Sequence, residues 1–185
     1  MTAGSRDHLR LFVALELSAA ARAALAAFRG VEADPRIWRP VADDALHLTL
    51  AFLGRRPGGD VESISEVLRE EAGPPPRLVL GAPLLLPPRR SRVLTVALDD
   101  PDGTLAALQG RVSAGLEGAG VFAPEKRPFR AHVTVARLRP RERAPRSVDA
   151  APEPLEFHAG PLTLFESRLH PRGASYEALS RVTLR

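Results

Sequence analysis

The sequence predicts a mixed α and β fold that is built from two similar halves. Apolar runs with the alternation of β-strands are separated by segments with helical spacing. The chain has 185 residues, enough for one domain or for two small lobes that share a core. Two short sequence matches recur at nearly equal offsets, which indicates an internal repeat.

The repeat consists of two pairs of matching segments. Val13-Ala-Leu-Glu16 matches Val96-Ala-Leu-Asp99, 83 residues later, and a predicted helix follows each of them. His47-Leu-Thr-Leu50 matches His132-Val-Thr-Val135, 85 residues later. Each match alone is short enough to arise by chance. Together, in the same strand–helix–strand order, they predict two halves related by a pseudo-twofold axis.

The strand pattern divides the chain into short extended segments. Strands are predicted over residues 10–17, 36–41, 46–53, 78–86, 93–99 and 129–138, with a final hairpin over residues 155–170 and 175–184. Gly54 is expected to end the third strand. Gly81 and Pro83 interrupt the fourth, which is therefore expected at an edge or at a bulge. Trp38 is expected in the core, with base stacking as the alternative.

Three helices are predicted between these strands. Ser18 is a good cap for a helix to about residue 29, and Gly30 is expected to stop it. Asp60 is expected to cap a second helix, which the run Gly73-Pro-Pro-Pro76 ends. A third helix is expected over residues 105–116. We expect one bilobal domain over residues 1–185, with residues 1–7 frayed and residues 139–154 a mobile loop.

Composition excludes several classes of function. The chain has no cysteine, so disulfides, thiolate nucleophiles, zinc ribbons and iron–sulfur clusters are ruled out. Its 26 basic and 22 acidic residues give a net charge of +4, and all the basic residues except Lys126 are arginines. Guanidinium groups bind phosphate well, which adds modest weight to a nucleic-acid or nucleotide partner, but on charge alone a solvated basic surface remains the favoured interpretation. No targeting or membrane segment is visible, so we expect a soluble, cytoplasmic monomer.

The matching segments place two histidines on apolar strands. Because side chains alternate on a strand, His47 shares a face with Thr49, and His132 shares a face with Thr134. The opposite faces are apolar and suit a core. Arg130 is expected on the face of His132. If the halves confront each other, two imidazoles, two hydroxyls and one guanidinium meet across a groove.

This set of groups is suited to acid–base attack on a phosphodiester. One neutral imidazole would take a proton from the attacking water, and one charged imidazole would give a proton to the departing sugar oxygen. The hydroxyls and Arg130 would hold the phosphate oxygens, with Arg89, Arg90 and Arg92 as further candidate contacts. No close pair or cluster of histidines suggests a metal site. The pattern is symmetric and does not say which histidine donates.

At these residues the chain resembles the 2H phosphoesterases. Within them it is most similar to the bacterial and archaeal RNA 2′,3′-cyclic phosphodiesterases, also called 2′-5′ RNA ligases (LigT/ThpR-like). The resemblance covers about residues 8–185. It rests on the segments 47–54 and 127–137, on the opening Arg10-Leu-Phe-Val-Ala, on Trp38, and on residues 166–176.

The resemblance implies an α+β fold of two pseudo-symmetric lobes, each an antiparallel sheet with outer helices, and an active groove between them. It implies that His47 is the proton donor and His132 the proton acceptor, and that Thr49 and Thr134 bind phosphate. The implied reaction opens an RNA 2′,3′-cyclic phosphate to a 2′-phosphomonoester, with no metal or cofactor. Ala131 and Val135 depart from the common family pattern, but both lie on the face opposite the imidazole.

Two alternatives to the hydrolase remain open. The same groove could join RNA ends through a 2′-5′ bond, because hydrolysis and ligation share the cyclic phosphate. A non-catalytic nucleotide-binding or RNA-binding module is the other alternative, although binding alone would not need an acid–base pair. Transfer-RNA halves, short oligonucleotides and small cyclic nucleotides would all suit such a groove.

Overall fold

The computed structural model describes residues 8–170 and 173–185. Its strands are β1 (His8–Glu16), β2 (Trp38–Pro40), β3 (His47–Pro57), β4 (Arg77–Leu86), β5 (Val93–Asp99), β6 (His132–Leu138), β7 (Glu156–His158), β8 (Leu162–His170) and β9 (Gly173–Val182). Its helices are α1 (Ala19–Glu32), α2 (Asp60–Glu71) and α3 (Thr104–Gly118), with a short 3₁₀ turn at Asp43–Ala45. The hairpin turn is expected at residues 171–173, and its first two residues lie outside the described residues, as do residues 1–7, which are expected to fray.

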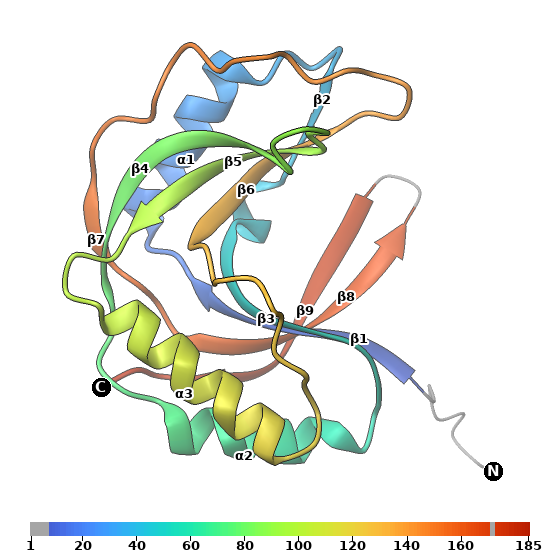
Figure 1. Ribbon diagram of the computed structural model, residues 1–185, viewed down its shortest axis with the longest axis vertical. Helices are drawn as coiled ribbons and strands as arrows, with labels where there is room; N and C mark the ends of the chain where they lie inside the picture. Colours follow the sequence, from blue (N-terminus) through green and yellow to red (C-terminus); the bar gives the residue numbers. More distant parts are fainter. Residues whose placement is uncertain (1–7, 171–172) are drawn as a thin grey trace.

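The strands form one curled antiparallel sheet in two halves (Figure 1). Its order is β7-β4-β5-β6-β3-β1-β8-β9, and β2 pairs separately with β6. The two halves meet at β3 and β6, which share a single paired position, Leu48 with Val133. Helix α1 packs against β6, whereas α2 and α3 pack against each other and beneath the β3-β1-β8-β9 half. The expected α+β fold of two antiparallel lobes with outer helices is therefore confirmed.

The backs of the two histidine strands lie in the core, as the alternation predicts. Leu46, Leu48 and Leu50 are at most 4% exposed, and Val133 and Val135 are fully buried. Trp38 is also buried, at 1% exposure, so its expected place in the core is confirmed. Burying each such side chain contributes about 1.5–3 kcal/mol and holds the two strands rigidly.

Several element boundaries differ from the expected ones. Ser18 caps α1 by accepting a hydrogen bond from the amide of Ala21, but the helix continues through Gly30 to Glu32. A glycine lowers helix stability without ending a helix whose other residues pack well. Gly59, not Asp60, is the cap residue of α2, and the aspartate is its first residue. Residues 139–154 form no helix or strand in the structure, as expected of a loop.

The third strand does not end at Gly54. That glycine has a φ of +71°, a left-handed conformation that glycine adopts without steric cost. It lies beside a bulge, where Phe12 pairs with Phe52 but Leu11 pairs with Gly54. The strand then continues to Pro57. The bulge predicted in β4 is confirmed by a shift of register between Leu80 and Pro83.

The expected single strand over residues 155–170 is divided in two. β7 pairs with β4 in one half, and β8 pairs with β1 in the other, so the chain crosses between halves at residues 159–161. The amide of Gly160 donates to the carbonyl of Glu16 at 2.7 Å. A Cβ at position 160 would lie 3.0 Å from that carbonyl oxygen, a tighter contact than side chains usually make, so the crossing favours a glycine.

Candidate functional site

Each of the two histidines predicted from the sequence begins a strand, and its ring contacts the backbone carbonyl two residues earlier. Nδ1 of His47 lies 2.8 Å from the carbonyl oxygen of Ala45, and Nδ1 of His132 lies 2.7 Å from that of Arg130. A carbonyl oxygen only accepts hydrogen bonds, so Nδ1 carries a proton in both rings. Nε2 is then the atom that changes its protonation. Both imidazoles are thereby prepared to take or give a proton at Nε2.

Both strands also carry a β-bulge at the same distance from the histidine. Leu50 has no partner between the pairs Ala14–Thr49 and Val13–Ala51. Val135 has no partner between the pairs Thr95–Thr134 and Leu94–Ala136. These two bulged residues are 85 positions apart, the offset of the histidine motifs.

A bulge changes which residues share a face. Beyond it, odd and even positions exchange sides, so Phe52 joins the face of His47 and Thr49. By the same shift, Arg137 joins the face of His132 and Thr134. Strict alternation had turned both residues away from the groove, and sequence reasoning therefore missed them. A bulge depends on pairing with another strand and has no reliable local signal.

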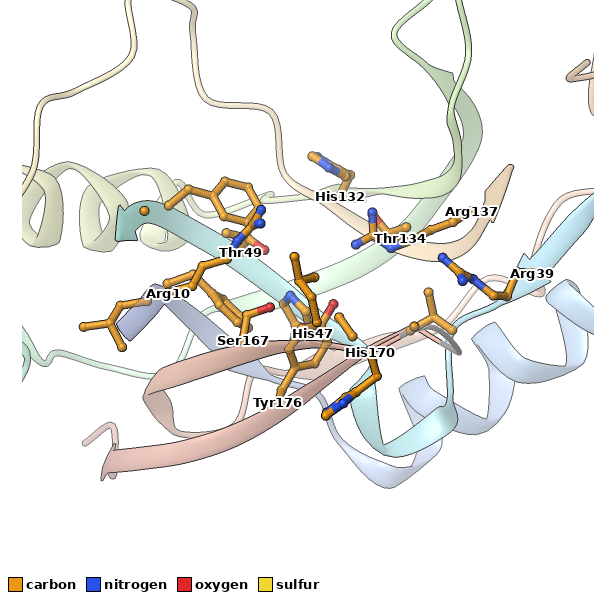
Figure 2. Close-up of a pocket in the computed structure, with 18 residues that line it drawn as sticks. Arg10, Arg39, His47, Thr49, His132, Thr134, Arg137, Ser167, His170 and Tyr176 are labelled. Atoms are coloured by element: carbon orange, nitrogen blue, oxygen red, sulfur yellow. The ribbon is translucent and has the colours of Figure 1, made fainter. Parts of the chain in front are cut away.

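The two histidine faces line one pocket of about 350 Å³ (Figure 2). His47, Thr49, His132 and Thr134 all contribute to its lining, as predicted from the strand pattern. The remaining polar groups come from other positions and were not predicted as site residues: Arg10, Arg39, Arg137, Ser167, His170 and Tyr176. Arg39 stands opposite Arg137 in the β2–β6 pair. The pocket thus brings three imidazoles, those of His47, His132 and His170, together with hydroxyls and guanidinium groups.

Arg130 lies elsewhere than strict alternation suggested. β6 begins at His132, so Arg130 precedes the strand, and its side chain is not part of the pocket lining. Its carbonyl, rather than its guanidinium, contacts His132. A phosphate contact by its side chain stays a prediction.

The two imidazoles have different surroundings. The ring of His47 packs against Phe12 with centroids 4.9 Å apart and meets Tyr176 edge-on at 5.1 Å, with Phe165 at 6.1 Å. Burial, together with the nearby charges of Arg137 and His132, lowers the pKa of His47 to about 4, although the hydrogen bond to the carbonyl of Ala45 acts in the opposite direction. His47 is therefore neutral at pH 7 in this structure. Among the described residues, no aromatic ring stacks on His132.

The described residues hold no group of three or more metal-ligating side chains placed to bind one ion. They also include no helix long and apolar enough to cross a membrane.

Comparison with known proteins agrees with this architecture. Residues 16–171 match the model of the 2′-5′ RNA ligase superfamily. An RNA 2′,3′-cyclic phosphodiesterase of Thermus thermophilus is 32% identical over an alignment that covers 96% of this chain and 91% of that protein. The chain therefore belongs to the 2′-5′ RNA ligase superfamily.

Solved structures agree as well. The apo crystal structure of Escherichia coli LigT superposes with a TM-score of 0.81 at 26% identity, and that of its complex with 3′-AMP with a TM-score of 0.82 at 28% identity. Each covers 96% of this chain and 98% of LigT. The resemblance found in the histidine motifs is confirmed over nearly the whole chain.

Proposed function

We propose that this protein hydrolyses the 2′,3′-cyclic phosphate at the end of an RNA to a 2′-phosphomonoester. The observation that carries the proposal is the pair of imidazoles on one pocket, each with Nδ1 tied to a carbonyl two residues earlier. The family membership and the phosphodiesterase relative support the choice of substrate.

The reaction needs one proton taken and one proton given. A water oxygen attacks the phosphorus while a neutral imidazole accepts the proton of that water at Nε2. The bond between phosphorus and O3′ breaks, and the second imidazole, initially charged, donates a proton to O3′. The products are a 2′-phosphate and a 3′-hydroxyl. Positioned acid–base catalysis of this kind contributes about 10²–10⁴-fold to a rate.

The rest of the pocket is suited to hold the phosphate. The hydroxyls of Thr49 and Thr134 stand on the histidine faces and can donate to the non-bridging oxygens. Arg39 and Arg137 bring positive charge to the place where negative charge grows in the transition state. Every group that this mechanism needs comes from the chain itself, and we propose that it proceeds without a metal ion or cofactor.

The roles of the two histidines follow from the family resemblance, with His47 as donor and His132 as acceptor. The depressed pKa of His47 means that it is neutral in the free protein at pH 7. To act as the acid, it must gain a proton when the anionic phosphate enters and offsets the charge of Arg137. The opposite assignment would use the neutral His47 directly as the base.

The decisive experiment incubates the purified protein with an RNA that ends in a 2′,3′-cyclic phosphate, in the presence of EDTA. We expect turnover and a 2′-phosphate product. Formation of a 3′-phosphate would contradict the bond assignment. Loss of turnover that a divalent cation restores would contradict the metal-free mechanism. Binding without turnover would favour the non-catalytic module.

Ligation at the same site is a second candidate, because the family model that the chain matches is that of 2′-5′ RNA ligases. In that reaction a 5′-hydroxyl takes the place of water, and the product is a 2′-5′ phosphodiester with a free 3′-hydroxyl. Adding an excess of RNA with a 5′-hydroxyl to the same assay tests it. Since water is present at a far higher concentration, we expect hydrolysis to dominate.

A further inference from the structure

A second pocket, of about 550 Å³, lies past the end of β6 and shares no residue with the histidine pocket. The connection between β4 and β5 forms one side, and the segment after β6 forms the other (Figure 1). Its lining includes five arginines and one acidic residue, Glu142. The arginines are Arg89, Arg90, Arg92, Arg143 and Arg146.

None of these five guanidinium groups has a side-chain partner in the described part of the chain. Some exposed arginines elsewhere pair with carboxylates, as Arg36 does with Asp34 and Arg69 with Glu62, whereas others within the same part, such as Arg185, do not. Within the described ranges, Glu142 forms no ion pair with any arginine of the pocket. Nearly all basic residues in this chain are arginines, so the presence of arginine at these positions carries little information. Their close grouping without acidic partners is informative, because like charges repel each other and their grouping costs free energy.

The position of this pocket connects it with the catalytic one. Arg137 and Leu138 are consecutive residues at the end of β6, and the first lines the histidine pocket while the second lines the basic pocket. The amide of Leu138 also donates to the carbonyl of Arg92 at 2.8 Å. From His132 to Leu138 the strand spans roughly 20 Å at about 3.3 Å per residue. A strand of nucleic acid that leaves the histidine pocket along β6 would reach the five arginines.

We propose that this basic pocket binds the backbone phosphates of the RNA strand upstream of the cyclic end. The inference rests on the proposed function and adds a second contact region, which an RNA strand can reach and a cyclic mononucleotide cannot. A single phosphate would neutralise only a small part of the five positive charges, whereas successive phosphates of one RNA strand can each pair with a different arginine. Such contacts add affinity that is independent of base sequence and depends on salt.

The test compares two variants with the same change in net charge. Arg90→Gln/Arg143→Gln removes one guanidinium from each side of the pocket. Arg69→Gln/Arg185→Gln is the matched control: both side chains are exposed, on α2 and at the chain end beside Gly73, at the other end of the molecule (Figure 1). Each variant is assayed on a 2′,3′-cyclic mononucleotide and on an oligonucleotide with the same cyclic end.

We expect the pocket variant to lose affinity for the oligonucleotide while its turnover of the mononucleotide equals that of the control. The slope of log binding constant against log salt concentration should become shallower by about 1.4, because each phosphate contact to a single strand contributes about 0.7 to that slope and two contacts are lost. Equal behaviour of the two variants on the oligonucleotide would overturn the inference. A matching loss on the mononucleotide would also overturn it, because the pocket would then act on the catalytic centre.

Direct binding keeps this test separate from the test of the proposed function. Fluorescence anisotropy is measured with the oligonucleotide and with a polyglutamate peptide of equal charge. If the wild-type protein hydrolyses neither substrate, the proposed function fails, while the anisotropy still reports on the pocket. If the pocket variant loses the peptide but keeps the oligonucleotide, the surface serves an acidic protein and the RNA assignment is wrong.

Discussion

The half that carries His47 and the half that carries His132 share a backbone design and differ in their side chains. Both histidines begin a strand, bond to a carbonyl two residues earlier and precede a bulge by three positions. Five residues after the histidine, however, the first half has Phe52 and the second has Arg137. The first imidazole lies among aromatic rings, whereas the second has none stacked on it in the described part of the chain.

This comparison shows how a symmetric backbone frame gives its two histidines different surroundings. The backbone gives both rings the same orientation and leaves Nε2 of each to exchange a proton. The surroundings of the two rings differ, and burial among Phe12 and Tyr176 disfavours charge on His47. An acid–base pair needs one neutral and one charged partner, so the proposed donor role requires His47 to gain a proton when the phosphate binds.

Removing either imidazole should have the largest effect. We expect His47→Ala and His132→Ala each to lower kcat by about 10²–10⁴-fold, measured on RNA with a 2′,3′-cyclic end. The double variant should lose far less than the product of the two losses, because both groups act on one transition state. Multiplicative losses would indicate that the two histidines act in separate steps.

A substrate whose leaving group needs no protonation distinguishes the two roles. If His47 is the donor, His47→Ala should retain most of its activity on that substrate while His132→Ala does not. The reverse result would exchange the roles and would agree with a neutral His47 acting as base. Equal losses on both substrates would contradict the acid–base assignment.

Replacing Arg137 should lower activity more than replacing Arg130, although strict alternation along the strand would place Arg130 on the face of His132. Arg137→Ala removes a charge beside the phosphate and should lower kcat/KM by about 10²–10³-fold. It should also raise the pKa of His47, because the positive charge of Arg137 now lowers it. NMR titration of the imidazole checks the shift. Arg130→Ala is the matched control, and an equal loss in the two variants would contradict the pocket geometry.

The burial of His47 should make stability depend on pH. Its pKa is about 4 in the folded protein against about 6.5 when unfolded, so below pH 6.5 the unfolded chain binds a proton that the folded protein does not. The free energy of unfolding should therefore fall by about 3 kcal/mol between roughly pH 6.5 and pH 4. Urea unfolding of the wild type and of His47→Gln measures this. Identical pH dependence in both proteins would refute the depressed pKa.

Replacing Phe52 should have the smallest effect, and it should weaken nucleotide binding rather than lower kcat. It lines the pocket and is 64% exposed, which is unusual for a large aromatic side chain and suits stacking on a base. Phe52→Ala should weaken binding of the terminal nucleotide by about 1–3 kcal/mol and leave kcat nearly unchanged. Leu169→Ala is the control, since Leu169 also lines the pocket and is 68% exposed but offers no ring. Similar increases of KM in the two variants would argue against stacking.

The sequence predicted the internal repeat only in part. His47–Leu50 and His132–Val135 are equivalent in the structure, down to the bulge at their last residue. The other match is displaced: Glu16 stands opposite His47, but Ala97, not Asp99, stands opposite His132. Register depends on cross-strand pairing and bulges, so a match of four residues does not determine it.

The sequence by itself determined the elements that are governed by local rules. Alternation on an apolar strand was sufficient to place His47 with Thr49 and His132 with Thr134, and helical spacing was sufficient for the three helices. The tertiary structure alone decided that Phe52 and Arg137 turn into the pocket, because a bulge exists only against a partner strand. It also brought in Arg10, Arg39 and Tyr176 from distant strands, and it set the pKa of His47. Desolvation is a property of everything packed around a group, and here those neighbours lie far from His47 along the chain.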